Sequence, residues 1–184
     1  MSFPTQKHKV IYADPAWNFK NWSSKGEGRN ANQHYRCMPL KDIKALPVQF
    51  CADKDCVLFM WVTFPFLEKA FEVIEAWGFT YKTVAFNWMK QNRKSDGLFM
   101  GGGYWTRSNG EVCLLATRGK PKRKAKDVRQ AILSHRREHS RKPDEIYERI
   151  ERLVDGPYLE LFARQQRPGW TSWGNETNKF KGAS

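Results

Sequence analysis

Residues 8–19, HKVIYADPAWNF, place a carboxylate, a proline and a tryptophan together where a short apolar segment ends. Asp14 can accept hydrogen bonds, Pro15 stiffens the backbone beside it, and Trp17 offers a broad aromatic face. A strand end that only turns the chain would favour Gly, Asn or Ser. The pattern predicts a site that holds and orients a flat, polar ring. The structural alternative is a buried Trp17 in a tight turn, with Asp14 capping a helix.

Apolar segments along the chain predict the elements that must position this turn. Residues 18–37 are rich in Asn, Ser, Gly and Lys and are typical of a loop. Proline at the first turn and Gly78 as a C-cap favour three helices. Strands are expected at 10–13, 56–62, 79–90, 111–117, 158–163 and 170–173, and helices at 39–46, 64–77 and 143–154. Alternating strands and helices, with strands apolar throughout, predict an α/β fold in one domain over residues 1–184, with a mostly parallel sheet flanked by helices.

Polar residues follow three of the expected strands. Asp14 comes after the first strand, Arg164 follows the strand at 158–163, and Asn175 and Glu176 follow the last strand. In open α/β sheets, ligands bind at the carboxyl ends of the strands. We therefore expect these side chains to converge on one crevice.

Positive charge is the strongest compositional feature. The chain has 32 Lys and Arg against 19 Asp and Glu, a formal net charge of +13. The segment 118–142 alone carries eleven Lys or Arg against two acidic residues. Such an excess favours nucleic acid as the partner, and Lys122, Arg123 and Lys124 are predicted to bind its phosphates. The alternative is a solvated loop.

Several classes of protein and site are excluded by composition and spacing. The sequence has no run of eighteen apolar residues, so no membrane span is expected, and the N-terminus lacks the apolar region of a secretory signal. The four cysteines show no repeated short spacing, so a zinc ribbon or disulfide framework is not expected, and a reducing cytoplasm fits. His135 and His139 lack a third ligand, so no metal site is predicted.

Six sequence segments, in order, resemble those of a known family. Asp14–Trp17, DPAW, is similar to the Asp-Pro-Pro-Trp signature of the MT-A family, the adenine amino-methyltransferases typified by the messenger-RNA adenosine methyltransferase catalytic subunit. The other segments are LFMWVT (58–63), AWGF (76–79), HSRKPDEIYERIE (139–151), ELFAR (160–164) and WGNE (173–176). The resemblance implies a Rossmann-like methyltransferase fold in which the catalytic motif precedes the cofactor-binding motifs. It covers residue 9 to about residue 176.

The implied reaction is methyl transfer from S-adenosylmethionine to the exocyclic amino group (N6) of adenine. The Asp14 carboxylate and the Pro15 carbonyl would accept the two amino hydrogens, and Trp17 would stack on the base. The amino nitrogen is a poor nucleophile because it is conjugated into its ring. Most of the acceleration would therefore come from alignment and electrostatic fit to the transition state.

The resemblance also implies residues that bind the methyl donor. Lys142 would pair with the carboxylate of the donor's methionine part, and Asp14 would favour the cationic donor. Arg164 would lie near the ribose, and Asn175 and Glu176 would bind its hydroxyl groups. The alternative for Lys142 is one more solvated lysine.

Three further positions near these motifs are assigned by the same matching. Phe162 would line the cofactor. Gln166 stands where the family usually has a histidine. Because only about nine residues precede the first strand, the candidates to cover the donor's adenine are Gln166 and a partner chain. Glu160 is either a cofactor residue or a structural ion-pair partner, and Ala16 replaces the family's second proline.

Substrate residues and substrate class complete the expectations. Tyr35 would hold the extruded nucleotide, and Trp105 and Glu111 match a second substrate loop; ordinary loop packing is the alternative for both aromatic residues. DNA is the expected substrate, with RNA, or a catalytically silent nucleic-acid-binding partner subunit, as alternatives. A homodimer or heterodimer is left open. The expected location is the cytoplasm of a bacterium or of a phage-infected cell.

Overall fold

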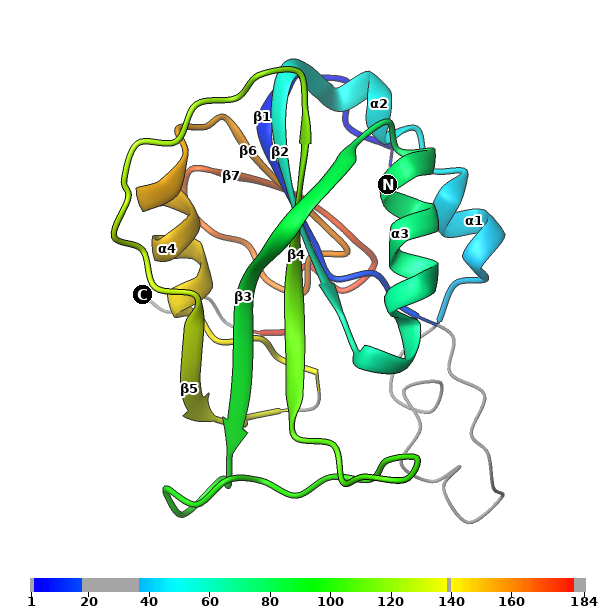
Figure 1. Cartoon of the computed structure of the whole chain (residues 1–184). Coiled ribbons are helices and arrows are strands. Elements are labelled where there is room, and N and C mark those ends of the chain that lie inside the picture. The colour runs from blue at the N-terminus through cyan, green and yellow to red at the C-terminus, as the bar shows by residue number, and fades with distance from the viewer. Residues whose placement is uncertain (1, 18–36, 139, 181–184) are drawn as a thin grey trace.

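The computed structural model describes residues 2–17, 37–138 and 140–180 and shows a seven-stranded sheet with helices on both faces (Figure 1). The strand order is β5-β3-β4-β2-β1-β6-β7. The strands are β1 (His8–Ala13), β2 (Ala52–Val62), β3 (Thr80–Gln91), β4 (Gly110–Arg118), β5 (Ala131–His135), β6 (Tyr158–Leu161) and β7 (Trp170–Trp173). The helices are α1 (Leu40–Lys44), α2 (Val48–Cys51), the 3-10 helix η3 (Phe64–Phe66), α3 (Leu67–Ala76) and α4 (Glu145–Leu153).

The sheet is mixed and mostly parallel. Strand β1 runs parallel to β2 and β6, β6 runs parallel to β7, and β3 runs parallel to β5. Strand β4 is antiparallel to both of its neighbours, β2 and β3. The expected α/β Rossmann-like fold is confirmed, with β4 as the strand that reverses direction.

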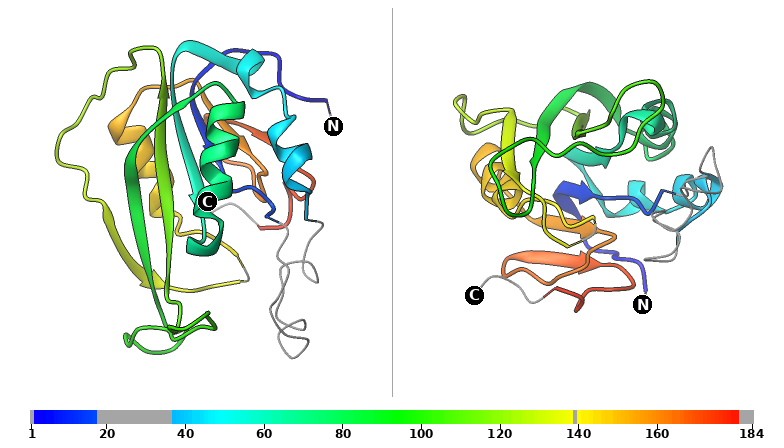
Figure 2. Two further views of the ribbon diagram at one scale, coloured as in Figure 1. Left: turned by 45° about the vertical axis from the view of Figure 1, so that its right-hand side comes forward. Right: turned by 90° about the horizontal axis from the view of Figure 1, so that it is seen from below.

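The alternation of side chains in β1 divides the core into two layers. Ile11 and Ala13 face the layer that also contains apolar residues of α1 and α3, whereas Val10 and Tyr12 face the layer containing apolar residues of α4. Figure 2 shows these helices on opposite faces of the sheet. Because both of its faces are covered, β1 is buried from Val10 to Ala13, and the Asp14 carboxylate comes directly after its last residue.

The helix predictions hold with altered boundaries. The helix expected at 39–46 begins after Pro39 and is followed by the separate short helix α2. The helix expected at 64–77 begins as η3 and continues as α3. Gly78 follows with a φ of 79°, the left-handed conformation that favours glycine after a helix.

The basic segment contains a strand that the charge pattern concealed. Residues 131–135 form β5, in which Ile132 is buried against β3. Its sequence AILSH has three apolar residues in succession, which was the available signal. Within the described ranges, none of the helices is both long and apolar enough to span a bilayer.

Candidate active site

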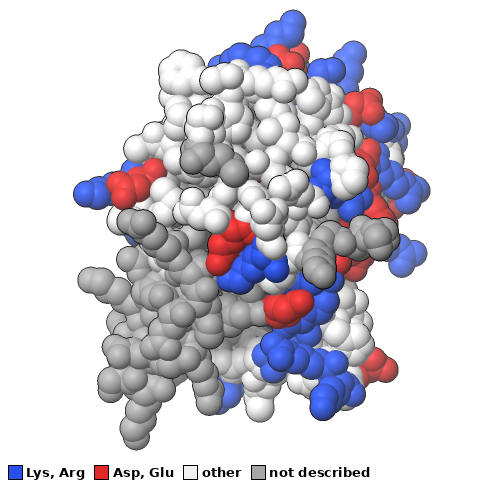
Figure 3. Space-filling model, turned by 180° about the vertical axis from the view of Figure 1, so that it is seen from behind, with Lys and Arg blue, Asp and Glu red and all other residues white. Residues whose placement is uncertain are grey.

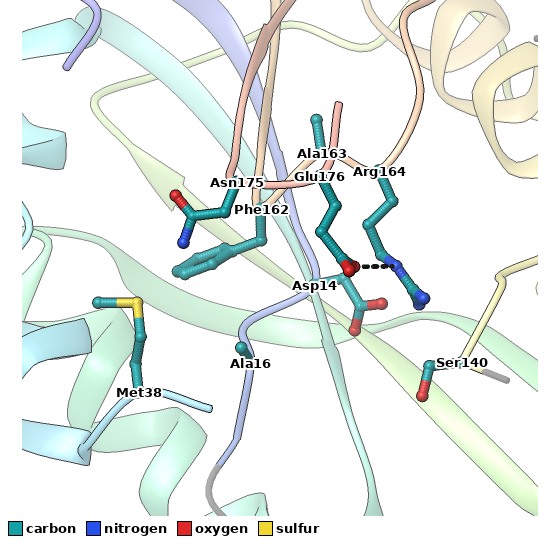
Figure 4. A pocket seen from close by; sticks show the side chains of 9 residues that line it. All are labelled: Asp14, Ala16, Met38, Ser140, Phe162, Ala163, Arg164, Asn175 and Glu176. Carbon is teal, nitrogen blue, oxygen red and sulfur yellow. Dashed lines mark hydrogen bonds and ion pairs between the residues drawn. The ribbon is translucent and has the colours of Figure 1, made fainter. Parts of the chain in front are cut away.

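A cavity of about 180 Å³ lies where β1, β6 and β7 end (Figure 4). Asp14 and Ala16 follow β1, and Met38 precedes α1. The remaining lining residues are Ser140, before α4, Phe162, Ala163 and Arg164 after β6, and Asn175 and Glu176 after β7. The structure therefore brings together the polar residues that follow three different strands, as parallel strands ending at one edge require.

Backbone conformation marks the same cavity. Only three non-glycine residues in the described part of the chain have a left-handed φ, and two of them, Ser140 (58°) and Phe162 (63°), line this cavity. Such conformations cost about 1–3 kcal/mol and persist where the surrounding structure enforces them, often at functional sites. Phe162 turns the chain directly after β6, so that its ring and the Arg164 side chain both face the cavity (Figure 4).

Asp14 is one end of a row of alternating charges. The Lys142 Nζ lies 2.6 Å from Asp14 Oδ2 and 3.2 Å from Glu111 Oε2. Glu111 in turn forms an ion pair with Lys90. The side chain of Lys142 is only 9% exposed, so two carboxylates balance a cation that has little access to water.

Neighbouring elements fix this row. Glu111 lies opposite Trp88 in the β3–β4 pairing, and Lys90, two residues after Trp88, projects from the same face of β3. The two ammonium groups lie near aromatic rings, Lys90 at 5.0 Å from the Trp88 centroid and Lys142 at 5.6 Å from the Trp61 centroid. Aromatic faces attract cations, so the buried rings of Trp88 and Trp61 stabilise the two ammonium groups as well as packing in the core.

The backbone of Lys142 is held from the preceding segment. One nitrogen of the Arg137 guanidinium donates to the Lys142 carbonyl at 2.9 Å, and another donates to Asp144 Oδ2 at 2.6 Å. Arg137 thus ties the residues on both sides of Pro143 before α4 begins. The position of the Lys142 ammonium depends on this anchor as well as on its carboxylate partners.

The pKa values of the two carboxyl groups move in opposite directions. Burial alone would raise the pKa of Glu111, but the charges of Lys142 and Lys90 outweigh it and lower that pKa to about 2. Burial raises the pKa of Asp14, Lys142 opposes this change, and the Glu111 charge adds to it. Glu111 therefore stays ionised, whereas Asp14 takes up a proton more readily than an ordinary aspartate.

The residues expected at the ribose form a second polar group. Arg164 Nε lies 3.1 Å from Glu176 Oε2, and Lys179 Nζ lies 2.7 Å from Glu176 Oε1. The Phe180 ring centroid lies 4.6 Å from the Arg164 guanidinium and 4.9 Å from the Arg141 guanidinium. In Figure 4 Glu176 and Arg164 lie beside Asp14, and Phe162 and Asn175 form the other wall.

The aromatic face that Trp17 was predicted to offer to a base is buried in this structure, as in the structural alternative. Trp17 is 5% exposed, its indole N–H donates to the Trp61 carbonyl at 3.2 Å, and its ring packs near Phe66. The backbone N–H of Trp17 donates to the Pro15 carbonyl at 2.8 Å. Trp17 thus shapes the turn from inside the core, and stacking on a base would require it to leave that position.

Other predicted residues lie away from the cavity. Gln166 is exposed, donates to Asn178 Oδ1 at 3.0 Å and lines a different cavity, with residues that include Trp170 and Ser172. Trp105 is 93% exposed in the loop between β3 and β4. Tyr35 lies outside the described residues, as does His139, and His135 Nε2 faces Asp96 Oδ1 at 3.3 Å.

Lys122, Arg123 and Lys124 lie at the opposite end of the sheet from Asp14. The backbone N–H of Lys124 donates to the Leu153 carbonyl at 2.7 Å, and its ammonium lies 2.7 Å from Asp155, both just before β6 begins. Asp14 and the other cavity residues follow the far ends of β1 and β6. A substrate would have to extend across the molecule to touch both places.

Glu160 forms a buried hydrogen bond with a neutral donor. The Tyr147 hydroxyl lies 3.1 and 3.0 Å from its two carboxylate oxygens. Burial raises the pKa of Glu160 to about 8, and the charge of Asp14 adds to this effect. The partner that the structure gives Glu160 is thus a tyrosine rather than a cation.

Sequence reasoning missed Lys90, Ser140 and Met38. Lys90 is the last residue of the strand expected at 79–90, so attention to strand ends would have found it. Ser140 and Met38 are ordinary loop residues in sequence, and only the folded chain brings them to the cavity.

Comparisons with known proteins match nearly the whole chain. The model of the MT-A70 family matches residues 8–176. The type II methyltransferase M.MunI of a Mycoplasma species is 35% identical over 94% of this chain and 79% of its own length. The N(6)-adenosine-methyltransferase MT-A70-like protein of Arabidopsis thaliana is 33% identical over 92% of this chain and 24% of its own length. The catalytic subunit METTL3 of Homo sapiens is 30% identical over 92% of this chain and 28% of its own length. The chain thus spans most of the first relative and about a quarter of the other two.

Proposed function

The chain belongs to the MT-A70 family, and we propose that it transfers a methyl group from S-adenosylmethionine to the N6 amino group of adenine in DNA. The family match confirms the resemblance seen in the six sequence segments and supports the enzyme class, an adenine-N6 methyltransferase. The observation that carries the proposal is the Asp14 carboxylate, which lies at the end of β1 in a cavity and is held there by Lys142 at 2.6 Å.

The residues around the cavity fit the chemistry of the proposed donor. Lys142 is a buried cation suited to the carboxylate of the methionine part, and Asp14 is an anion suited to a sulfonium. Asn175 and Glu176 offer polar groups for the ribose hydroxyls, and Phe162 offers an apolar wall. When bound, S-adenosylmethionine supplies an electrophilic methyl group.

Asp14 and Pro15 would then act on the substrate amino group. The Asp14 carboxylate and the Pro15 carbonyl accept its two hydrogens, which directs the nitrogen lone pair along the line of displacement. The Pro15 carbonyl already accepts the N–H of Trp17, and its second lone pair supplies the acceptor. As the nitrogen–carbon bond forms and the carbon–sulfur bond breaks, the nitrogen must lose one proton. Asp14, with its raised pKa, is the base positioned to receive it.

Lys142 has two roles in this scheme. It now binds Asp14 and Glu111, and the donor carboxylate would become a third anionic partner. Because Lys90 already neutralises Glu111, Lys142 can shift toward the donor without leaving Glu111 uncompensated. The Asp14 oxygen that Lys142 now holds then becomes available to the adenine amino group.

DNA is proposed over RNA because of the extent of the matches. The relative that this chain covers over most of its length is named a type II methyltransferase, and its name does not specify adenosine, the nucleoside of RNA. The proteins named as adenosine methyltransferases share only about a quarter of their length with it. The retained Asp14 and Lys142 disfavour a catalytically silent partner. A dimer, and the cytoplasm of a bacterium or of a phage-infected cell, stay predictions.

The proposal is tested by incubating the full chain with tritium-labelled S-adenosylmethionine and separate pools of unmethylated genomic DNA and total RNA. After digestion to nucleosides, label is expected in N6-methyldeoxyadenosine. Label in N6-methyladenosine alone would replace DNA by RNA as the substrate. Label in neither nucleoside, with the chain shown to be folded, would refute the proposal.

A further inference from the structure

The loop 92–109, between β3 and β4, exposes apolar side chains that the core does not use. Trp105 is 93% exposed, the highest value among the exposed large hydrophobic residues of the described part of the chain. Leu98 and Met100 of the same loop are 57% and 66% exposed. Singly exposed apolar residues are common, but a group of them on one projecting loop indicates a surface that meets a partner.

Hydrogen bonds within the loop order its tip. Gly101 N–H donates to the Ser108 carbonyl at 2.8 Å, and Ser108 N–H donates to the Gly102 carbonyl at 3.0 Å. Arg107 Nε donates to the Gly101 carbonyl at 2.7 Å. A Cβ at Gly103 would lie 2.0 Å from the Thr106 carbonyl oxygen, so this position requires glycine. The turn is therefore organised before any partner binds.

Trp105 sits at this tip in a strained conformation. Its φ is 66°, the third left-handed non-glycine residue besides the two that line the Asp14 cavity. This conformation costs about 1–3 kcal/mol, and a ring left almost fully in water gains little hydrophobic stabilisation in return. Its ring contacts that of the neighbouring Tyr104, with the two centroids 6.2 Å apart. An observed cost of this kind indicates a function for the side chain.

The loop begins and ends at the buried charges. Lys90 lies two residues before it, and Glu111 lies two residues after it. The loop extends from the lower edge of the sheet in Figure 1.

The loop carries exposed Arg93, Lys94 and Arg107 against the single carboxylate of Asp96. Figure 3 shows Lys and Arg side chains low on the molecule, toward the end from which the loop extends, and also along its top and one side. Aromatic and basic side chains together complement nucleic acid.

We propose that loop 92–109 opens duplex DNA and that Trp105 inserts into the base stack where the target adenine has left it. The inference rests on the proposed function, because only an enzyme that acts on a base inside a duplex needs to extrude that base. Arg93, Lys94 and Arg107 bind the phosphates beside the opened step.

The physical reason is the gap that extrusion creates. Removing a base from a duplex loses its stacking and pairing, and a side chain with a broad planar face can replace part of the lost stacking. Trp105 has such a face and is presented on a turn that is already ordered, so little conformational entropy is lost on insertion. A single strand has no such gap, so the same residue contributes much less there.

The test compares two forms of one DNA sample, which removes the need to know the target sequence. Methyl transfer from tritium-labelled S-adenosylmethionine is measured on sheared unmethylated genomic DNA, as duplex and after heat denaturation and rapid cooling. Trp105→Ala is expected to lower kcat/KM on duplex about tenfold or more, and on denatured DNA less than about threefold. Trp105→Phe, which keeps a planar ring, should restore most of the duplex activity.

Phe50→Ala, at an exposed aromatic residue of α2 at the other end of the molecule in Figure 1, is the matched control and should change neither activity. Thermal unfolding checks that Trp105→Ala folds, as the exposure of Trp105 predicts. An equal loss on both DNA forms would overturn the proposal, since Trp105 would then act on the extruded base or on catalysis. Unchanged duplex activity would also overturn it. A wild-type chain inactive on both forms, in contrast, would refute the proposed function itself.

Discussion

Two groups of basic residues in this protein, Lys122–Lys124 and the pair Lys90 and Lys142, differ in burial and in partners. Lys122 and Arg123 are exposed, and Lys124, with a side chain 46% exposed, pairs with an Asp155 that is itself largely in water. Lys142, in contrast, is almost buried and shares its charge between Asp14 and Glu111. The exposed group belongs to the basic segment 118–142 that stands out in the sequence, and the buried group lies beside the Asp14 cavity.

The number of charges in a sequence therefore indicates a class of partner but does not identify the position of a reaction site. Exposed ion pairs contribute about 0–1 kcal/mol and are screened by salt. A buried pair costs desolvation and is held only by precise geometry, so breaking one partner costs about 3–5 kcal/mol. Functional precision is therefore expected in the Asp14–Lys142–Glu111–Lys90 row, and only general attraction for phosphates in Lys122–Lys124.

Asp14→Ala should have the largest effect, because it removes an acceptor of the amino hydrogens. We expect methyl transfer to fall about a thousandfold or more. Binding of S-adenosylmethionine, measured by calorimetry, should persist because Lys142 stays in place. Unchanged single-turnover rates would remove Asp14 from the mechanism.

Lys90→Met should have an intermediate effect at a distance from the substrate. Without Lys90, the pKa of Glu111 rises above about 2, and Glu111 competes more strongly with Asp14 for Lys142. We expect kcat/KM to fall about tenfold. Lys90→Arg should recover most of this loss, since it keeps the charge.

Lys82→Met, at an exposed position on the same strand, is the matched control for Lys90. If Lys82→Met and Lys90→Met reduced kcat/KM equally, the row of charges would have no special role. Equal activity of Lys90→Met and wild type would lead to the same conclusion.

Glu160→Gln should alter the pH dependence of stability more than activity. The pKa of Glu160 is about 8 in the folded chain, above the ordinary value of 4.5, so the folded state binds a proton that the unfolded state has lost. The wild type should therefore lose stability as the pH rises from about 5 to about 8, by a few kcal/mol at most, and the Gln variant should lack this loss.

Thermal unfolding at about pH 5 and about pH 8.5 measures the Glu160 effect. Glu148→Gln, at an exposed position on α4, is the control, and its difference in melting temperature from wild type should not change between the two pH values. A difference in melting temperature between Glu160→Gln and wild type that stays constant with pH would contradict the buried, protonated state.

Neutralising Lys122, Arg123 and Lys124 to Gln should have the smallest effect. We expect the KM for DNA to rise about two- to threefold at low salt and the salt dependence to flatten, with kcat unchanged. A fall in kcat as large as that of Asp14→Ala would remove the distinction between the exposed and the buried basic residues.

Much of the fold followed from local sequence. Continuous apolar runs such as residues 56–62 predicted buried strands, and helical spacing together with Gly78 predicted α3 and its end. Strand β5 was concealed because it contains only three consecutive apolar residues within a strongly charged segment. The reversed direction of β4 comes from its antiparallel pairing with β2 and with the preceding strand β3, and no local pattern within β4 encodes it.

The site was predictable where a residue directly follows a strand. Asp14, Arg164, Asn175 and Glu176 meet at one cavity because their strands end at the same edge. The burial of Trp17 and the pairing of Glu111 with Lys90 depend on side-chain packing across the sheet. Sequence spacing carries no information on such contacts, so Trp17 was predicted to offer its face to a base although it is part of the core.

The most direct test is a calorimetric titration of S-adenosylmethionine into three proteins: wild type, Lys142→Met, and the variant with Lys122, Arg123 and Lys124 changed to Gln. If the buried charges form the methyl-donor end of the site, Lys142→Met should weaken binding about tenfold or more, and the triple variant should bind within about twofold of wild type. Equal affinities for Lys142→Met and wild type, or a weaker affinity only in the triple variant, would contradict this account.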